Sequence, residues 1–295
     1  MSGIRQDASF VDADGVTIHY SVWERAQPRG VVQIAHGLGE HRLRYERLAE
    51  ALVAAGYSVW ADDHRGHGAT GLEQHGGDRR RLGRLGPGGH RATVAAVRAF
   101  GERARAANPG LPLVLFGHSW GSLIAQILLN MRPSAYDAVV LSGSALRTLR
   151  DMNGGDLNAR HRALGDKDYE WLSRDPAVVA AAAADELMFT ATAIKSFGLL
   201  DAMRLLGLPA KGLAAERDVP LLLQVGSDDT LGGEPSVAKL ARAYVERSGF
   251  TDVTAIVYPG ARHEIYNETN RQEVTADLIA WLDARLAGAR EDASA

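Results

Sequence analysis

Leu113-Val114-Leu115-Phe116-Gly117-His118-Ser119-Trp120-Gly121 is the stretch of sequence that decides the fold. Its first four residues form an unbroken apolar run, and the last five match the pattern G-x-S-x-G. Apolar residues then recur at helical spacing until a proline, namely Leu123, Ile124, Ile127, Leu128 and Met131 before Pro133. A buried strand that enters a helix through such a glycine-bounded turn is the setting of a nucleophile elbow. The pattern predicts that Ser119 projects with its hydroxyl exposed, beside a helix N-terminus that favours negative charge; a plain strand-to-helix turn is the alternative.

Similar apolar runs on both sides of this stretch indicate a parallel sheet. They lie at Val31–Ala35, Ser58–Trp60, Leu113–Phe116, Ala138–Leu141, Leu221–Val225 and Val253–Tyr258. Such runs are typical of strands buried on both faces, and the helical patterns between them indicate helices on both sides of the sheet. Nearer the N-terminus, Val16–Trp23 alternates apolar and polar residues, which predicts a half-exposed antiparallel strand. The expected fold class is α/β, with a mostly parallel central sheet and an antiparallel hairpin at its N-terminal edge.

The segment 144–215 departs from this alternation because it contains no convincing strand. Polar turns and helix-like apolar clusters fill it, so we expect a helical cap inserted between residues 1–143 and 216–295, which form the two parts of the core. Open α/β sheets bind ligands at the C-terminal ends of their strands, and the cap would cover that edge. Within it, Phe197, Leu200 and Met203 are apolar residues that we expect to line the substrate pocket.

The composition excludes several classes of function. The chain has 295 residues and no cysteine, which removes thiol catalysis and cysteine-ligated metal centres. Its formal charge of −3 gives no reason to expect a nucleic acid as a partner. Its longest apolar run, Val178–Ala184, is far shorter than the roughly 18–20 residues that span a bilayer, and the N-terminus lacks the apolar stretch of a signal peptide. We therefore expect a soluble, cytoplasmic protein without stable membrane insertion.

A serine hydroxyl becomes nucleophilic only when a base takes its proton, and His263 is the candidate for that base. Of the ten histidines, only His161 and His263 lie well beyond Ser119, and on this kind of scaffold the chain order is serine, acid, histidine. His161 falls in the expected cap, whereas His263 follows the last predicted strand. The acid would fix the histidine tautomer and stabilise the imidazolium. It should follow the preceding predicted strand, where the chain offers two candidates, Asp228 and Asp229.

Two backbone N–H groups are candidates for stabilising an oxyanion. One belongs to Trp120, directly after the candidate nucleophile. The other should come from the loop after an early strand, where the chain is His36-Gly37-Leu38-Gly39 and the flanking glycines let the Leu38 N–H approach a substrate oxygen. The stretch Asp62-Asp63-His64-Arg65-Gly66-His67 lacks the spacing of a metallohydrolase site. We interpret it as a polar loop that pins the oxyanion loop, rather than as a metal site.

Five motifs in order resemble the monoacylglycerol lipase and lysophospholipase branch of the α/β-hydrolases, a serine aminopeptidase S33-type group. They are His36-Gly37-Leu38-Gly39-Glu40-His41, Asp63-His64-Arg65-Gly66-His67-Gly68, Gly117-His118-Ser119-Trp120-Gly121, Gly226-Ser227-Asp228-Asp229 and the Gly260–His263 stretch. The resemblance spans about residues 14–285 and implies an α/β-hydrolase fold whose helical cap lines the acyl site. In related hydrolases the acid takes the last position of a G-x-x-D pattern, which implies Asp229. Trp120 and Ser122 stand where monoacylglycerol lipases more usually have Met and Gly.

The resemblance implies a serine hydrolase that forms an acyl-enzyme on Ser119 and needs neither cofactor nor metal. The expected substrate is a small carboxylic ester, similar to a monoacylglycerol or a lysophospholipid. A lactonase, an aminopeptidase or amidase, and a carbon–carbon bond hydrolase are alternatives on the same fold. An aminopeptidase would need a carboxylate to hold the substrate ammonium, and the cap offers Asp168, Glu170, Asp185 and Glu186. The fold also hosts non-catalytic binding proteins, but these lose triad members, and all the candidates are present here.

Overall fold

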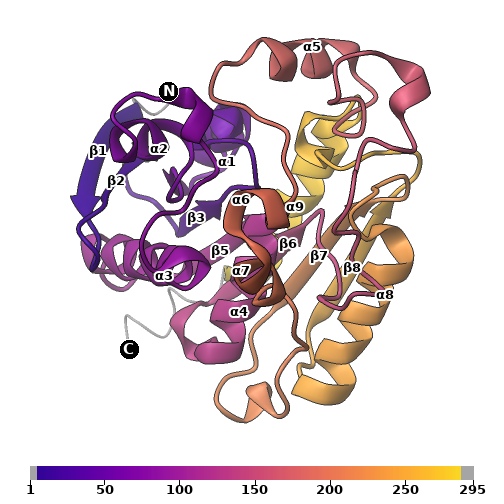
Figure 1. Ribbon diagram of the computed structural model, residues 1–295. Coiled ribbons are helices and arrows are strands. Elements are labelled where there is room, and N and C mark those ends of the chain that lie inside the picture. The colour runs from indigo at the N-terminus through magenta and orange to yellow at the C-terminus, as the bar shows by residue number, and fades with distance from the viewer. Residues whose placement is uncertain (1–4, 287–295) are drawn as a thin grey trace, which may run out of the picture.

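An eight-stranded, mostly parallel sheet forms the centre of the protein (Figure 1). The computed structural model describes residues 5–286, and within them the strand order is β1-β2-β4-β3-β5-β6-β7-β8. The strands are β1 (Arg5–Val11), β2 (Thr17–Trp23), β3 (Val31–Ala35), β4 (Ser58–Asp62), β5 (Leu113–His118), β6 (Ala138–Ser142), β7 (Leu221–Gly226) and β8 (Val253–Tyr258). β2 pairs antiparallel with β1 and with β4, whereas all the other pairs are parallel. The fold class predicted from the apolar runs is confirmed.

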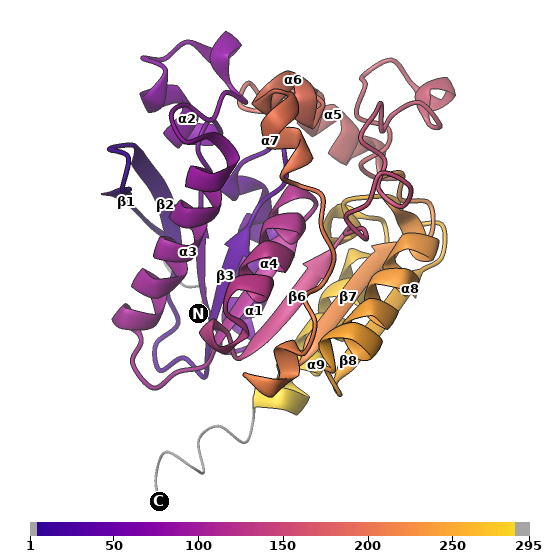
Figure 2. The ribbon, with the colours of Figure 1, turned by 60° about the horizontal axis from the view of Figure 1, so that its bottom comes forward.

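Helices cover both faces of the sheet (Figure 2). One face carries α3 (Gly89–Ala107), α4 (Trp120–Met131) and α8 (Gly233–Ala243), and the other carries α1 (Glu46–Ala54) and α9 (Arg271–Leu286). Each face has its own buried apolar cluster because successive side chains of a strand point to opposite faces: Leu115 packs in one cluster, and Val114 and Phe116 pack in the other. Every residue of β3 to β7 is buried, as expected for strands that are covered twice.

After β6 the chain passes over the edge of the sheet where the parallel strands end, and the last part of the segment between β6 and β7, near residues 208–215, runs back past the C-terminal end of α4 toward the start of β7 (Figure 2). Among the described residues this segment holds no strand, only short helices and turns: α5 (Pro176–Ala184), α6 (Ala193–Phe197), α7 (Leu199–Met203) and the 3-10 turns Arg162–Leu164 and Leu213–Ala215. A further short helix, α2 (Gly68–Gln74), follows β4. In residues 5–286, no helix combines the length and the apolar character needed to cross a bilayer.

Candidate active site

Ser119 occupies the sharp turn between β5 and α4. Its backbone has φ 52° and ψ −122°, an unusual conformation for a residue with a side chain. The flanking glycines are needed because a Cβ on Gly117 would lie 2.5 Å from the Gly121 carbonyl oxygen, and one on Gly121 would lie 2.0 Å from the Ala35 carbonyl oxygen. The Ser119 N–H donates to the Ser142 carbonyl at 3.0 Å, which ties the turn to β6. The predicted strand–turn–helix setting is therefore present, and the serine stands at the C-terminal edge of the sheet.

Asp229 and His263 form a buried pair beside this turn. His263 Nδ1 lies 2.9 Å from Asp229 Oδ1, which also accepts the Leu231 N–H at 2.8 Å. Burial alone lowers the pKa of His263, but the charge and the hydrogen bond of Asp229 outweigh it, so the pKa lies above its ordinary value of 6.5. Asp228, the other candidate, turns toward solvent and pairs with Arg160 at 2.9 Å. The structure thus brings Asp229, and not Asp228, to the histidine.

The other ring nitrogen of His263 is directed at the space that Ser119 also lines. Within residues 5–286, His263 Nε2 is buried and makes no hydrogen bond, whether to Ser119 Oγ or to another atom. Catalytic hydrogen bonds are often long in unliganded enzymes and tighten only with substrate. The arrangement can therefore accept a proton from the serine once an ester occupies the site.

Two aromatic rings to which the sequence analysis assigned no role enclose His263. The Trp171 ring lies 4.6 Å from it and the His118 ring lies 4.7 Å from it, centroid to centroid. The Trp171 carbonyl also accepts the His263 N–H at 3.3 Å, so this part of the segment between β6 and β7 rests directly on the histidine loop. Burial and the neighbouring His263 hold the pKa of His118 well below its ordinary value, which keeps that ring neutral. The two rings shield His263 from water and limit its rotation.

Glu268 is a further residue to which the sequence analysis assigned no role. Its carboxylate is fully buried and accepts the backbone N–H groups of Arg262 at 2.9 Å, Thr269 at 2.9 Å and Arg174 at 3.0 Å, together with the Arg174 side chain. Burial alone would raise the pKa of Glu268, but these hydrogen bonds lower it below its ordinary value. The carboxylate thereby joins Arg174, which precedes α5, to the residue directly before His263.

The loop that carries Leu38 is fixed on two sides. Glu40 Oε1 accepts the Gly37 N–H and the Tyr45 hydroxyl, the latter at 2.7 Å. On the other side, the Phe189 N–H donates to the Gly39 carbonyl at 3.0 Å, and a Cβ on Gly39 (φ +83°) would lie 2.2 Å from the Phe189 oxygen. In the described chain the Leu38 N–H has no hydrogen-bond partner of its own, and the Trp120 N–H lies at the start of α4, where helical N–H groups are free. Both predicted donors are thus available to a substrate oxygen.

The stretch Asp62–His67 supports this loop. Asp63 is buried and accepts the Arg42 N–H and the Ala69 N–H, at 2.9 and 2.8 Å, as well as the Arg42 side chain. The His64 N–H donates to His36 Nε2 at 2.9 Å, which fixes the residue before Gly37. These contacts agree with the interpretation as a pinning loop. In residues 5–286 no three or more candidate ligand side chains are arranged to hold a metal ion.

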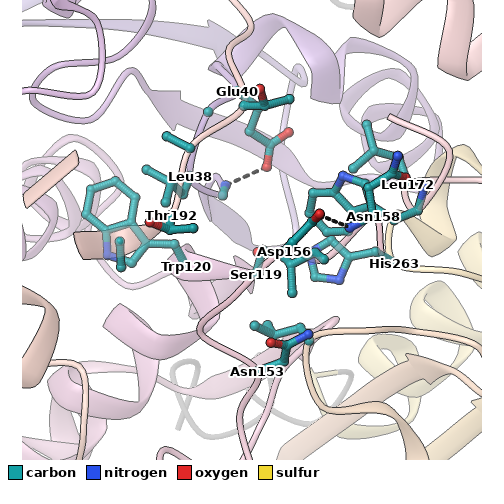
Figure 3. Close-up of a pocket in the computed structure, with 18 of the residues that line it drawn as sticks. Leu38, Glu40, Ser119, Trp120, Asn153, Asp156, Asn158, Leu172, Thr192 and His263 are labelled. Carbon is teal, nitrogen blue, oxygen red and sulfur yellow. Dashed lines mark hydrogen bonds between the residues drawn. The ribbon is translucent and has the colours of Figure 1, made fainter. Parts of the chain in front are cut away.

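A cavity of about 360 Å³ opens above Ser119 (Figure 3). Leu38 and Trp120 lie on one side of the serine, and Asp156, Asn158 and His263 lie on the other. Phe197 lines the cavity as the sequence analysis expected, and of the four cap carboxylates considered for an ammonium group only Asp168 does so.

Leu200 and Met203 differ from the expectation, because they lie outside the cavity. They are 75% and 56% exposed, on a five-residue helix whose apolar side chains face solvent. Leu205, two residues after that helix, lines the cavity in their place. Local apolar clustering identified the segment correctly but not the direction of its side chains.

Comparisons with known proteins show which proteins this chain is similar to. The model of the serine aminopeptidase S33 family matches residues 26–270. The chain is similar to the monoacylglycerol lipase of Mycolicibacterium smegmatis, with 36% identity over 97% of this chain and 100% of that protein, and to the human monoglyceride lipase, with 29% identity over 95% and 91%. A crystal structure of a thermostable carboxyl esterase from Bacillus coagulans has the same fold, with a TM-score of 0.79, 24% identity and coverage of 97% and 99%.

Proposed function

Because the chain belongs to the serine aminopeptidase S33 family of α/β-hydrolases, we propose that it is a carboxylic ester hydrolase that forms an acyl-enzyme on Ser119. The observation that carries this assignment is the buried pair of His263 and Asp229, 2.9 Å apart, beside an elbow serine that lines the same cavity. Such a base, oriented by a carboxylate, is what a serine needs to become a nucleophile.

The proposed reaction proceeds in two halves. Ser119 Oγ attacks the ester carbonyl while His263 Nε2 takes its proton, and the Asp229 carboxylate stabilises the imidazolium. The N–H groups of Leu38 and Trp120 hold the oxyanion. His263 then gives the proton to the leaving alcohol, and a water attacks the acyl-enzyme with His263 again acting as base. The carboxylic acid leaves and Ser119 is restored.

The proposed substrate class is a monoacylglycerol-like ester. Relatives of this chain are named monoacylglycerol lipase and monoglyceride lipase. The cavity supports the extension to this protein, because the polar residues Asn153, Asp156 and Asn158 line it, the last two on the His263 side of Ser119, and such groups suit a polyol. Cleavage of an aminoacyl amide is the second candidate, favoured by the Asp168 carboxylate in the cavity wall.

The remaining parts of the proposal concern organisation and location. Residues 144–215 act as a cap that completes the substrate site, inserted between core parts 1–143 and 216–295. Contacts at both ends of the site support this role, since Asp185 in the cap binds His41 at 2.9 Å and the Trp171 carbonyl accepts the His263 N–H. We place the protein in the cytoplasm, and cell fractionation tests that location.

Hydrolysis by the Ser119→Ala variant tests the function. Removal of a triad member costs several orders of magnitude in rate, so we expect the variant to lose almost all hydrolysis of p-nitrophenyl butyrate and of 1-monobutyrin while it remains folded. Ser9→Ala, at an exposed serine of β1, is the matched control and should keep wild-type rates. Hydrolysis by Ser119→Ala at near wild-type rates would reject the assignment.

A further inference from the structure

We propose that the Trp120 side chain closes the acyl side of the cavity and so restricts the enzyme to esters of short acyl chains. This inference rests on the proposed function, because it takes Ser119 as the nucleophile and His263 as the proton donor to the leaving group. It concerns the indole ring of Trp120, whereas the proposed oxyanion contact uses only its backbone N–H.

The direction of the acyl chain follows from the proton transfers. The leaving oxygen must come within reach of His263 Nε2, so the alcohol lies on the His263 side of Ser119. The carbonyl oxygen points to the N–H groups of Leu38 and Trp120, and the acyl chain takes the remaining tetrahedral direction, which we infer to lead away from His263. In Figure 3 that is the side on which Leu38 and Trp120 lie.

The character of the two sides agrees with this direction. We name the wall on the Leu38 side of Ser119 the acyl arm; its apolar part consists of Leu38, Trp120 and Phe197, whose ring packs on Trp120, and Thr192 lies beside them. These three apolar residues line the cavity and also belong to, or pack against, one hydrophobic cluster of the core. Apolar walls favour a hydrocarbon chain by about 0.8 kcal/mol per buried methylene. An acyl chain therefore gains burial free energy on this side, whereas on the His263 side the polar groups of Asp156 and Asn158 accompany the Trp171 ring.

Trp120 bounds the acyl arm because its ring is held in place from several directions. Trp120 is 3% exposed, and its ring centroid lies 4.8 Å from the ring of Phe197 on α6. Behind it, the rings of His67, His64 and His90 lie at 5.2, 5.5 and 5.9 Å. Moving such a packed aromatic group aside costs free energy, because protein interiors are packed about as densely as crystals of small organic molecules.

The cap segment that carries Phe197 is itself anchored. The Asp201 carboxylate of α7 accepts the His90 N–H of α3 at 3.0 Å, and the His90 ring stacks on Phe197 at 6.0 Å. Burial lowers the pKa of His90 to about 4, so the ring is neutral at pH 7 and adds no charge to this wall. Trp120 and Phe197 therefore meet as a fixed boundary of the acyl arm.

The size of the cavity leads to the same conclusion. Its volume of about 360 Å³ must hold the alcohol as well as the acyl chain. Sites for small molecules usually measure roughly 300–1,000 Å³, so this one lies near the lower limit. We therefore expect the cavity to hold a short acyl chain beside the alcohol, and a longer chain to need the space that the Trp120 ring occupies.

The test compares kcat/KM for p-nitrophenyl butyrate, octanoate and dodecanoate, in which the leaving group stays constant. In the wild type we expect the dodecanoate value to be lower than the butyrate value. Trp120→Met replaces the indole with a narrow, flexible side chain and should raise the dodecanoate-to-butyrate ratio at least tenfold, since each newly buried methylene is worth about fourfold. Phe197→Leu opens the same boundary from the cap and serves as the second variant should Trp120→Met fail to fold.

Leu200→Ala is the matched control, because Leu200 belongs to the same cap segment but lies outside the cavity; its ratio should stay within twofold of the wild type. Labelling by a fluorophosphonate verifies an intact site in each variant. A ratio unchanged in both Trp120→Met and Phe197→Leu, or raised equally by Leu200→Ala, overturns this inference while the proposed function stands. A wild type that neither hydrolyses butyrate nor reacts with the fluorophosphonate overturns the proposed function itself.

Discussion

Replacement of Asp229 by Asn should nearly abolish turnover, whereas the same change at Asp228 should matter little. The Asp229 carboxylate lies 2.9 Å from His263 Nδ1, and both groups are buried. At that separation and an effective dielectric constant of about 20, the attraction between carboxylate and imidazolium is about 6 kcal/mol. Its loss corresponds to about 10⁴ in rate, and the same type of substitution in a serine protease costs about 10⁴ in kcat.

Asp228→Asn supplies the matched control. Its side chain is 36% exposed and pairs with an exposed Arg160, and such pairs contribute about 0–1 kcal/mol. A tenfold fall in rate corresponds to about 1.4 kcal/mol, which is more than such a pair contributes, so we expect kcat to fall by less than about tenfold. Steady-state kinetics on p-nitrophenyl butyrate, with circular dichroism to verify folding, measures both variants. The reverse ranking, or an Asp229→Asn variant within tenfold of the wild type, would refute the assignment of Asp229 as the acid.

Three further predictions concern pH, the elbow and the histidine loop. Asp229 raises the pKa of His263 above 6.5, and only the neutral ring can accept the serine proton. The kcat/KM of the wild type should therefore rise with pH through a midpoint above 6.5. In a pH–rate profile of Asp229→Asn that midpoint should be lower. The same shift means that protonated His263 stabilises the folded state at low pH and that this contribution is lost as pH rises through the raised pKa. Gly121→Ala should lower the free energy of unfolding by at least about 1–3 kcal/mol and so lower the thermal midpoint, because the new Cβ would lie 2.0 Å from a backbone oxygen. Gly154→Ala is the control: a Cβ there meets open space, so the thermal midpoint should be nearly unchanged. If the Glu268 carboxylate positions His263, Glu268→Gln should lower kcat about tenfold with little change in KM. The shorter Glu268→Asp side chain should restore the thermal midpoint more fully than it restores kcat. A loss of kcat that only matches the loss of folded protein would contradict the positioning role.

The parts of the site that the sequence predicted are those with a local cause. A strand, a tight turn and a helix follow one another within 20 residues, so the elbow at Ser119 was visible in the residue pattern, as were the glycines that allow the backbone to approach closely. The order of serine, acid and histidine along the chain pointed to His263. The choice between two neighbouring aspartates needed the resemblance, because local spacing does not say which carboxylate turns inward.

The parts that the sequence did not predict depend on contacts between distant residues. Trp171 contacts His263 and Asp185 contacts His41, although the two residues of each pair are 92 and 144 positions apart in the sequence. No periodicity of the sequence predicts such pairs. The prediction that Leu200 and Met203 line the pocket was wrong for a related reason. A helix of five residues is too short for its spacing to define a buried face, so its apolar residues could turn to solvent while Leu205 turned inward.

Peptide mass spectrometry after reaction with a fluorophosphonate tests the central claim most directly, because it identifies the residue that becomes covalently modified. We predict a single adduct on the peptide that contains Ser119, formed at the same rate at which hydrolysis of p-nitrophenyl butyrate is lost. An adduct on any other residue, or hydrolysis that persists after Ser119 is fully modified, would contradict the account.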